Sequence, residues 1–144
     1  MDNTLIILNS ITDNCNSSGV IYTWTGYDEN RSKKSLLRYV EENGDNLRAK
    51  YLEFVHDLGE FKHNDIKIRE HFQISESLSL WWMSLIAEKS PYKSSRIIDC
   101  IRLIAIEKIL TDQSPTELVF YVNDASLAMI IKNLCGKLGI KFYL

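Results

Sequence analysis

Four short apolar segments recur along the chain between polar, turn-rich stretches. They cover residues 4–8 (TLIIL), 20–24 (VIYTW), 117–122 (ELVFYV) and 140–144 (IKFYL). Their β-branched and aromatic side chains favour strands, and a continuous apolar run is typical of a strand buried on both faces of a parallel sheet. The pattern therefore predicts four strands.

The last of these segments belong to a predicted β–α–β unit. Apolar residues at helical spacing cover residues 125–138, between the strands at 117–122 and 140–144, and Gly139 follows as the residue that ends the helix. Such a unit implies a parallel, right-handed crossover. Together with the two N-terminal strands it indicates a Rossmann-like α/β fold, a three-layer parallel sheet, with residues 1–144 as one domain.

Helical patterns dominate the middle of the chain. Ser32 is the expected N-cap of a pattern that extends to residue 58, and Asn43 and Gly44 interrupt it, which allows two helices or one kinked helix. Residues 62–73 alternate only in part, so an edge strand and a loop both stay open.

Two further helices are predicted after this ambiguous segment. The first covers residues 75–89, where Ser75 is the expected cap and Pro91 ends the helix. The second runs from Ser94 or Ser95 to about residue 111.

The composition is that of an ordinary globular domain. The chain has 144 residues, of which 45% are hydrophobic and 25% charged, and its net charge is −2. This mixture does not fit disorder, collagen or a coiled coil, and nothing global attracts nucleic acid or an anionic membrane. The longest strongly apolar stretch, residues 78–87, is far shorter than the about 20 residues of a membrane span.

The cysteines indicate a reducing compartment. Cys15, Cys100 and Cys135 form no C-x-x-C pair, and an odd number of separated cysteines favours reduced thiols. The first residues also lack the basic and apolar parts of a signal peptide. We therefore expect a cytoplasmic protein.

Strong cofactor and catalytic motifs are absent from the sequence. It contains no G-x-x-x-x-G-K-[ST], no G-x-G-x-x-G and no G-x-S-x-G. His56, His63 and His71 are spaced without a zinc motif. We expect no metal and no cofactor, and a dinucleotide-dependent oxidoreductase is disfavoured.

Polar residues follow the predicted strands, where open α/β sheets bind their ligands. These are Asn9 and Ser10, then residues 25–27, then Asn123 and Asp124. Asn123 and Asp124 also precede a helix, whose first backbone N–H groups are able to hold an anion. The alternative is that Asp124 only caps that helix, which is the more common role of such an aspartate.

The segment 77–93 (SLSLWWMSLIAEKSPYK) is the most unusual part of the sequence. Two adjacent helical positions point about 100° apart, so one indole of Trp81 and Trp82 is expected to pack in the core. The other is then free to line a cleft and to stack on a sugar or on a base. A carboxylate, two ammonium groups and hydroxyls follow, on Glu88, Lys89, Ser90, Tyr92 and Lys93. The alternative is two core tryptophans followed by an ordinary polar helix end.

This segment resembles a bacterial family of surface carbohydrate biosynthesis proteins. The resemblance covers residues 78–144 and rests on the tryptophan pair, the EKSP segment and a VND strand end: Trp81, Trp82, Ser84, Glu88, Lys89, Ser90, Pro91, Val122, Asn123 and Asp124. Members of that family are longer and are similar to glycosyltransferases of the GT-B arrangement, with two Rossmann-like domains. The resemblance implies that these 144 residues are the N-terminal, acceptor-side domain, and that the nucleotide sugar binds a C-terminal domain outside them.

The resemblance also implies roles for individual residues. Trp81 or Trp82 would stack on an acceptor sugar, while Ser90, Tyr92 and Asn123 would contact it. Glu88 or Asp124 would accept hydrogen bonds from sugar hydroxyls or act as general base. Lys89 and Lys93 would meet a carboxylate or phosphate. The expected partners are then a carbohydrate acceptor, a nucleotide sugar held by the other domain, and the inner-membrane machinery at the periphery, and the isolated chain is expected to be inactive.

Two other functions stay open. One is a non-enzymatic α/β module that binds a partner, or a second copy of itself, through an exposed apolar patch. The other is a small stand-alone nucleotide-binding protein of flavodoxin-like shape, which the absence of a phosphate loop disfavours. Nothing indicates a nucleic-acid partner.

Overall fold

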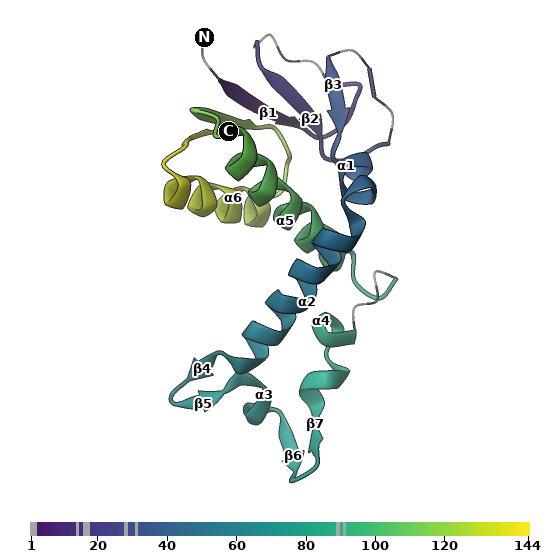
Figure 1. Ribbon diagram of the computed structural model, residues 1–144, viewed down its shortest axis with the longest axis vertical. Helices are drawn as coiled ribbons and strands as arrows, with labels where there is room; N and C mark the ends of the chain where they lie inside the picture. Colours follow the sequence, from purple (N-terminus) through teal and green to yellow (C-terminus); the bar gives the residue numbers. More distant parts are fainter. Residues whose placement is uncertain are drawn as a thin grey trace. The chain divides into compact units, whose positions relative to one another are not determined.

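The chain consists of two compact units (Figure 1). A computed structural model describes residues 3–13, 15, 18–27, 29–30, 32–88, 90 and 92–144. Unit 1 comprises Met1–Asn43 and Ala105–Leu144, and unit 2 comprises Gly44–Ile104. Helix α5 (Ser95–Gln113) begins in unit 2 and ends in unit 1.

Unit 1 is built on a five-stranded sheet in which every strand pair is parallel (Figure 1). The strand order is β3-β2-β1-β8-β9. The strands are β1 (Thr4–Leu8), β2 (Val20–Thr23), β3 (Lys33–Ser35), β8 (Glu117–Phe120) and β9 (Lys141–Tyr143). The predicted Rossmann-like α/β class is confirmed, because the sheet is parallel throughout and flanked by helices.

The centre of the sheet carries the core of unit 1. Strand β1 lies between β2 and β8 and all five of its residues are buried, as its unbroken apolar run predicts. Phe120 extends this core, because its ring packs edge-on against Trp24 with centroids 6.0 Å apart. The connections from β1 to β2 and from β2 to β3 contain no helix among their described residues.

The predicted β–α–β unit is confirmed. Helix α6 (Ala125–Leu138) joins β8 to β9, and Gly139 ends it in the left-handed conformation with φ 71°. Its apolar stripe is buried against the sheet through Leu127, Ile131 and Cys135. Burial raises the pKa of the Cys135 thiol to about 11.

Two helices, not one kinked helix, follow β3. Helix α1 (Leu36–Glu42) ends at Asn43, and α2 (Gly44–Glu60) begins at the next residue. The expected cap at Ser32 is wrong. Ser35 caps α1 instead, since its hydroxyl accepts a hydrogen bond from Arg38 N at 3.1 Å, and Lys33 and Lys34 belong to the edge strand β3.

Unit 2 consists of α2, the beginning of α5 and short elements between them. These are β4 (Lys62–His63), β5 (Ile66–Lys67), α3 (Ile68–His71), β6 (Gln73–Ser75), β7 (Leu78–Ser79), the 3₁₀ helix η1 (Leu80–Met83) and α4 (Leu85–Glu88). The pairs β4-β5 and β6-β7 are antiparallel hairpins. The ambiguous segment 62–73 therefore contains the first hairpin, whose turn places Asn64 and Asp65 at positive φ.

The predicted helix over residues 75–89 is wrong. A hairpin, a 3₁₀ turn and the four-residue helix α4 replace it. The reason lies in local hydrogen bonds that compete with helix formation. The Ser79 hydroxyl donates to the Arg69 carbonyl at 2.6 Å and accepts from Trp81 N at 3.3 Å, and Leu80 N donates to the Phe72 carbonyl at 2.9 Å. The next predicted helix, from Ser94 or Ser95 to about residue 111, is confirmed as α5.

Unit 2 has a small core of its own. Its buried members are Tyr51, Val55, Trp81, Ala87 and Ile97. The Tyr51 hydroxyl donates to the Ile86 carbonyl at 3.1 Å, which joins α2 to α4. Across the described residues of both units, no helix has the length and apolar character needed to cross a membrane.

Candidate functional site

A surface pocket of about 260 Å³ lies in unit 2 beside the tryptophan pair. It is formed by α3, the β6-β7 hairpin and η1. Its lining combines one indole, one apolar side chain and six polar or charged residues: Trp82, Leu78, Arg69, Glu70, Gln73, Glu76, Ser77 and Ser79. This mixture of an aromatic face and many polar groups is suited to a polyhydroxylated ligand.

The two adjacent tryptophans have opposite environments. Trp81 is 4% exposed and packs against Phe72, with ring centroids 6.3 Å apart, whereas Trp82 is 61% exposed and lines the pocket. Gly59 of α2 makes room for Trp81, because a Cβ there would lie 3.1 Å from the indole nitrogen. One indole therefore fixes η1 in the core of unit 2 while its neighbour stays available to a ligand.

The cationic side of the pocket is anchored by Glu60. The Arg69 Nε lies 2.9 Å from one carboxylate oxygen of Glu60, and Lys67 Nζ lies 2.6 Å from the other. The hydrogen bond from Lys67, followed by the charge of Arg69, holds the pKa of Glu60 below its usual range. Arg69 is thus oriented by a salt bridge and is already partly neutralised.

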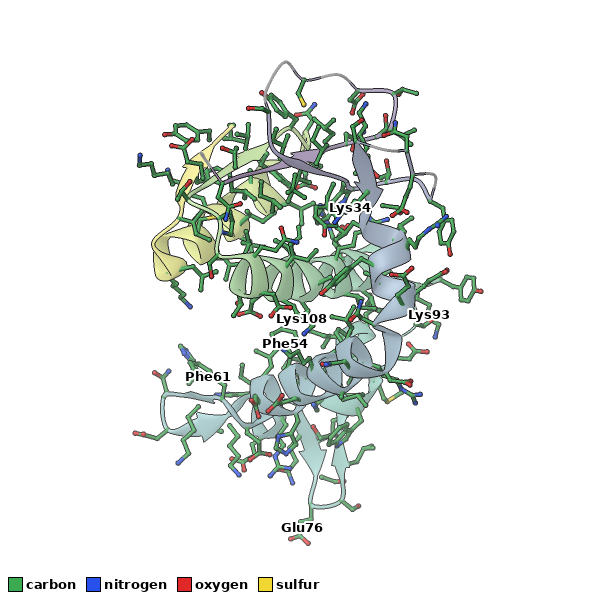
Figure 2. All side chains as sticks on the ribbon, turned by 45° about the horizontal axis from the view of Figure 1, so that its top comes forward. Lys34, Phe54, Phe61, Glu76, Lys93 and Lys108 are labelled. Atoms are coloured by element: carbon green, nitrogen blue, oxygen red, sulfur yellow. The ribbon has the colours of Figure 1, made fainter. Side chains whose placement is uncertain are left out.

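The hairpin turn supplies the acidic side. Glu76 lies at the tip of the β6-β7 turn (Figure 2). The Gln73 side-chain amide donates to the carbonyls of Ser75 and Glu76 at 3.1 and 3.4 Å, which closes the turn. Glu70 on α3 completes the acidic lining, and its carboxylate accepts a long bond of 3.4 Å from Lys67 N.

The other residues predicted from this segment lie apart from the pocket lining. Glu88 ends α4 and pairs with the Lys93 ammonium, and Tyr92 is 99% exposed. The Ser90 carbonyl accepts from Lys93 N at 3.1 Å in a turn. Of the described residues in this group, none lines the Trp82 pocket. The prediction for Lys89 lies outside the described residues.

The carboxyl ends of β1, β2 and β8 meet at one edge of the sheet in unit 1, as the sequence predicts. Asn9 and Thr25 are joined there, since the Thr25 hydroxyl and amide donate to the Asn9 carbonyl at 2.6 and 2.9 Å. Ser10 N donates to the Asp13 carboxylate at 2.8 Å. Asn123 is exposed on the same edge.

Asp124 acts as the N-cap of α6. Its Oδ1 accepts hydrogen bonds from Ser126 N and Leu127 N at 2.9 and 3.0 Å. A carboxylate therefore occupies the position in which the helix start would hold an anion, and the capping role of Asp124 is confirmed.

Sequence reasoning missed the polar half of the pocket. Arg69, Glu70, Gln73 and Glu76 lie in or beside the segment that stayed open between strand and loop. A signal was present, because Ile74, Leu78 and Leu80 alternate with polar residues at the spacing of a strand. The helical spacing of Leu78, Trp81, Trp82 and Leu85 competes with this signal.

Comparison with known proteins identifies no relative of the chain. No family model, curated protein or solved structure matches it. Within the part of the chain that the structure describes, no group of three or more His, Cys, Asp or Glu side chains is arranged to hold a metal ion. The Trp82 pocket is therefore the feature of the structure that indicates a function.

Proposed function

We propose that this protein binds a carbohydrate at the Trp82 pocket and acts as the acceptor-side domain of a glycosyltransferase in bacterial surface polysaccharide biosynthesis. The observation that carries the proposal is the exposed indole of Trp82 in a pocket lined by carboxylates, an amide and hydroxyls. The wider assignment, to polysaccharide biosynthesis, comes from the resemblance of residues 78–144.

The chemistry of the pocket supports a sugar ligand. An indole face packs well against the C–H face of a sugar ring, and polar groups around it bond the ring hydroxyls. A volume of about 260 Å³ is small, which favours one sugar ring in the pocket with its neighbours outside. Stacking is assigned to Trp82, because Trp81 belongs to the core of unit 2.

The remaining roles are part of the same proposal. In unit 2, Glu88 would serve an acceptor hydroxyl as general base, and Lys93, Ser90 and Tyr92 would contact the acceptor. In unit 1, Asp124 and Asn123 are the alternative residues for these two roles. The ion pair between Glu88 and Lys93 and the capping bonds of Asp124 are the interactions that these groups would have to share with a ligand.

A ¹⁵N NMR titration of the chain tests the proposal with a built-in control. The three tryptophan indoles are Trp24 and Trp81, both buried, and Trp82, which is exposed. We expect the Trp82 indole N–H signal to move on addition of oligosaccharides at about 1 mM, the range of weak carbohydrate affinity, while the two buried indoles stay in place. Nucleotides alone are expected to leave all three signals unchanged.

Two variants sharpen this titration. Trp82→Ala is expected to abolish binding, whereas Met83→Ala, at an equally exposed neighbour that does not line the pocket, is expected to retain it. An unmoved Trp82 signal with neutral, acidic and amino oligosaccharides alike would contradict the proposal.

A second candidate function is association through apolar surface. Large apolar side chains are exposed along the same segment of unit 2, at Ile74, Leu78, Met83 and Leu85. The same NMR sample tests this alternative without added ligand: broadening of the hairpin signals as the protein concentration rises would favour self-association over carbohydrate binding.

A further inference from the structure

We propose that the Trp82 pocket selects an amino sugar, a saccharide that carries a protonated amine. The inference rests on the proposed function, since it names the class of saccharide that the same pocket takes. Three properties of the lining lead to it: its charge, its hydrogen-bond acceptors and its aromatic face.

The charge of the lining favours a cation. The lining contains two carboxylates, of Glu70 and Glu76, and one guanidinium, of Arg69. The Arg69 Nε already lies 2.9 Å from a carboxylate oxygen of Glu60, so part of the Arg69 charge is neutralised within unit 2. An acidic sugar would bring a third carboxylate beside two others, and like charges at close range are unfavourable.

The hydrogen-bonding groups lead to the same conclusion. The Gln73 side chain donates to two backbone carbonyls of its own turn, and the Ser79 hydroxyl donates to the Arg69 carbonyl. These donors are used within the protein. The carboxylates of Glu70 and Glu76 are acceptors, and an ammonium group offers them three donors in one place.

The indole of Trp82 also attracts a cation. The face of an aromatic ring carries a negative partial charge, and tryptophan attracts cations most strongly of the aromatic residues. An amine attached to a ring that stacks on Trp82 would meet the indole face in the same pocket whose lining contains the two carboxylates. Stacking and charge therefore act on the same ligand rather than on competing ones.

The test compares three oligosaccharides on the full chain. Glucosamine trisaccharide carries free amines, its N-acetylated form has the same backbone without the charge, and a galacturonic acid trisaccharide is acidic. We expect the glucosamine form to bind about three- to tenfold more tightly than the N-acetylated form, followed at the Trp82 indole signal. This preference is expected to shrink as salt is added, because exposed charges are screened.

A pair of variants connects the preference to the carboxylates. Glu76→Gln is expected to weaken binding of the free amine by about two- to fivefold and to leave the N-acetylated form unchanged. The matched control is Glu53→Gln, an exposed glutamate of α2 that does not line the pocket.

The outcomes separate this inference from the proposed function. Equal or tighter binding of the N-acetylated or acidic form, or a preference that survives Glu70→Gln combined with Glu76→Gln, would overturn the amino-sugar assignment while carbohydrate binding stands. Absence of any response at Trp82 to all three would overturn both.

Discussion

The two units differ in the balance between buried and exposed apolar side chains. In unit 1 the apolar residues of the central strand are all buried, and Leu118 and Ile131 beside it are sealed from solvent as well. In unit 2 a small core coexists with large apolar side chains on the surface, among them Phe61, Ile74 and Trp82. The hydrophobic content of 45% is an average over the whole chain and does not reveal this difference between the units.

The difference follows from the length and regularity of the elements. A five-stranded parallel sheet hides side chains on both faces of its middle strand, so unit 1 is organised around packing. Hairpins with strands of two or three residues have no interior, so their side chains either reach the small core or stay in solvent. Unit 2 therefore exposes apolar and polar side chains side by side, and it contains the Trp82 pocket.

The largest expected effect distinguishes the core of unit 2 from its surface. Trp81→Ala is expected to destabilise unit 2 by about 3–5 kcal/mol, because it removes the central buried ring of a small core. Trp82→Ala, one residue away and exposed, is expected to change stability by no more than about 0.5 kcal/mol. Native-state hydrogen exchange, observed separately for the amides of α2 and of β1, measures both effects.

A result that reversed this order would remove the distinction between the two indoles. If Trp82→Ala proved as costly as Trp81→Ala, the exposed indole would be part of the core under solution conditions, and the pocket would lose its aromatic face. Gly59→Ala provides an independent check, because its Cβ would crowd Trp81 and not Trp82.

Unit 1 was predictable because its signals are local and unambiguous. The unbroken run of β1, the strand–helix–strand pattern after residue 116 and the αL glycine at 139 each point to one structure. The edge strand β3 was missed, because KKS has neither apolar character nor length. It forms through its neighbour, where Tyr22 pairs with Lys34 in register.

Unit 2 was less predictable because short elements depend on contacts that sequence periodicity does not encode. Leu78, Trp81, Trp82 and Leu85 match a helical stripe, yet the Ser79 hydroxyl and the Phe72 carbonyl redirect the backbone into a turn. The tryptophan pair was conspicuous in the sequence, and its second member, Trp82, lines the pocket. Its partners Arg69 and Glu70 were not conspicuous, because only the hairpin brings them to it.

The second prediction concerns the N-cap of α6 in unit 1. Asp124→Ala is expected to destabilise unit 1 by about 0.5–2 kcal/mol, because two backbone N–H groups at the start of α6 lose their acceptor. Asp124→Asn keeps an oxygen in that position and is expected to cost much less. Urea unfolding followed by hydrogen exchange at Ser126 and Leu127 measures the loss. A neutral Asp124→Ala would mean that α6 is held by its buried face alone.

The smallest expected effect is electrostatic and belongs to unit 2. Lys67 and Arg69 hold the pKa of Glu60 below the value of about 4.3 found in unfolded chains. A carboxylate with a depressed pKa contributes stability above its unfolded pKa, and that contribution is lost as the pH falls through the folded pKa. Glu60→Gln is therefore expected to lower the urea midpoint of unit 2 at neutral pH by a small amount, and the difference from the parent protein is expected to vanish at low pH, once Glu60 is protonated in the folded protein.

This pH dependence distinguishes the contribution of the Glu60 charge to stability from the contribution of its packing. Glu53→Gln on the same helix is the control, because Glu53 forms no ion pair with any described residue and is expected to leave the midpoint unchanged at both pH values. If the Glu60→Gln difference persisted at low pH, the side chain would act through its packing, as residues of unit 1 do. Arg69 would then be oriented by its surroundings rather than by Glu60, and its charge would be free to oppose an amine in the pocket.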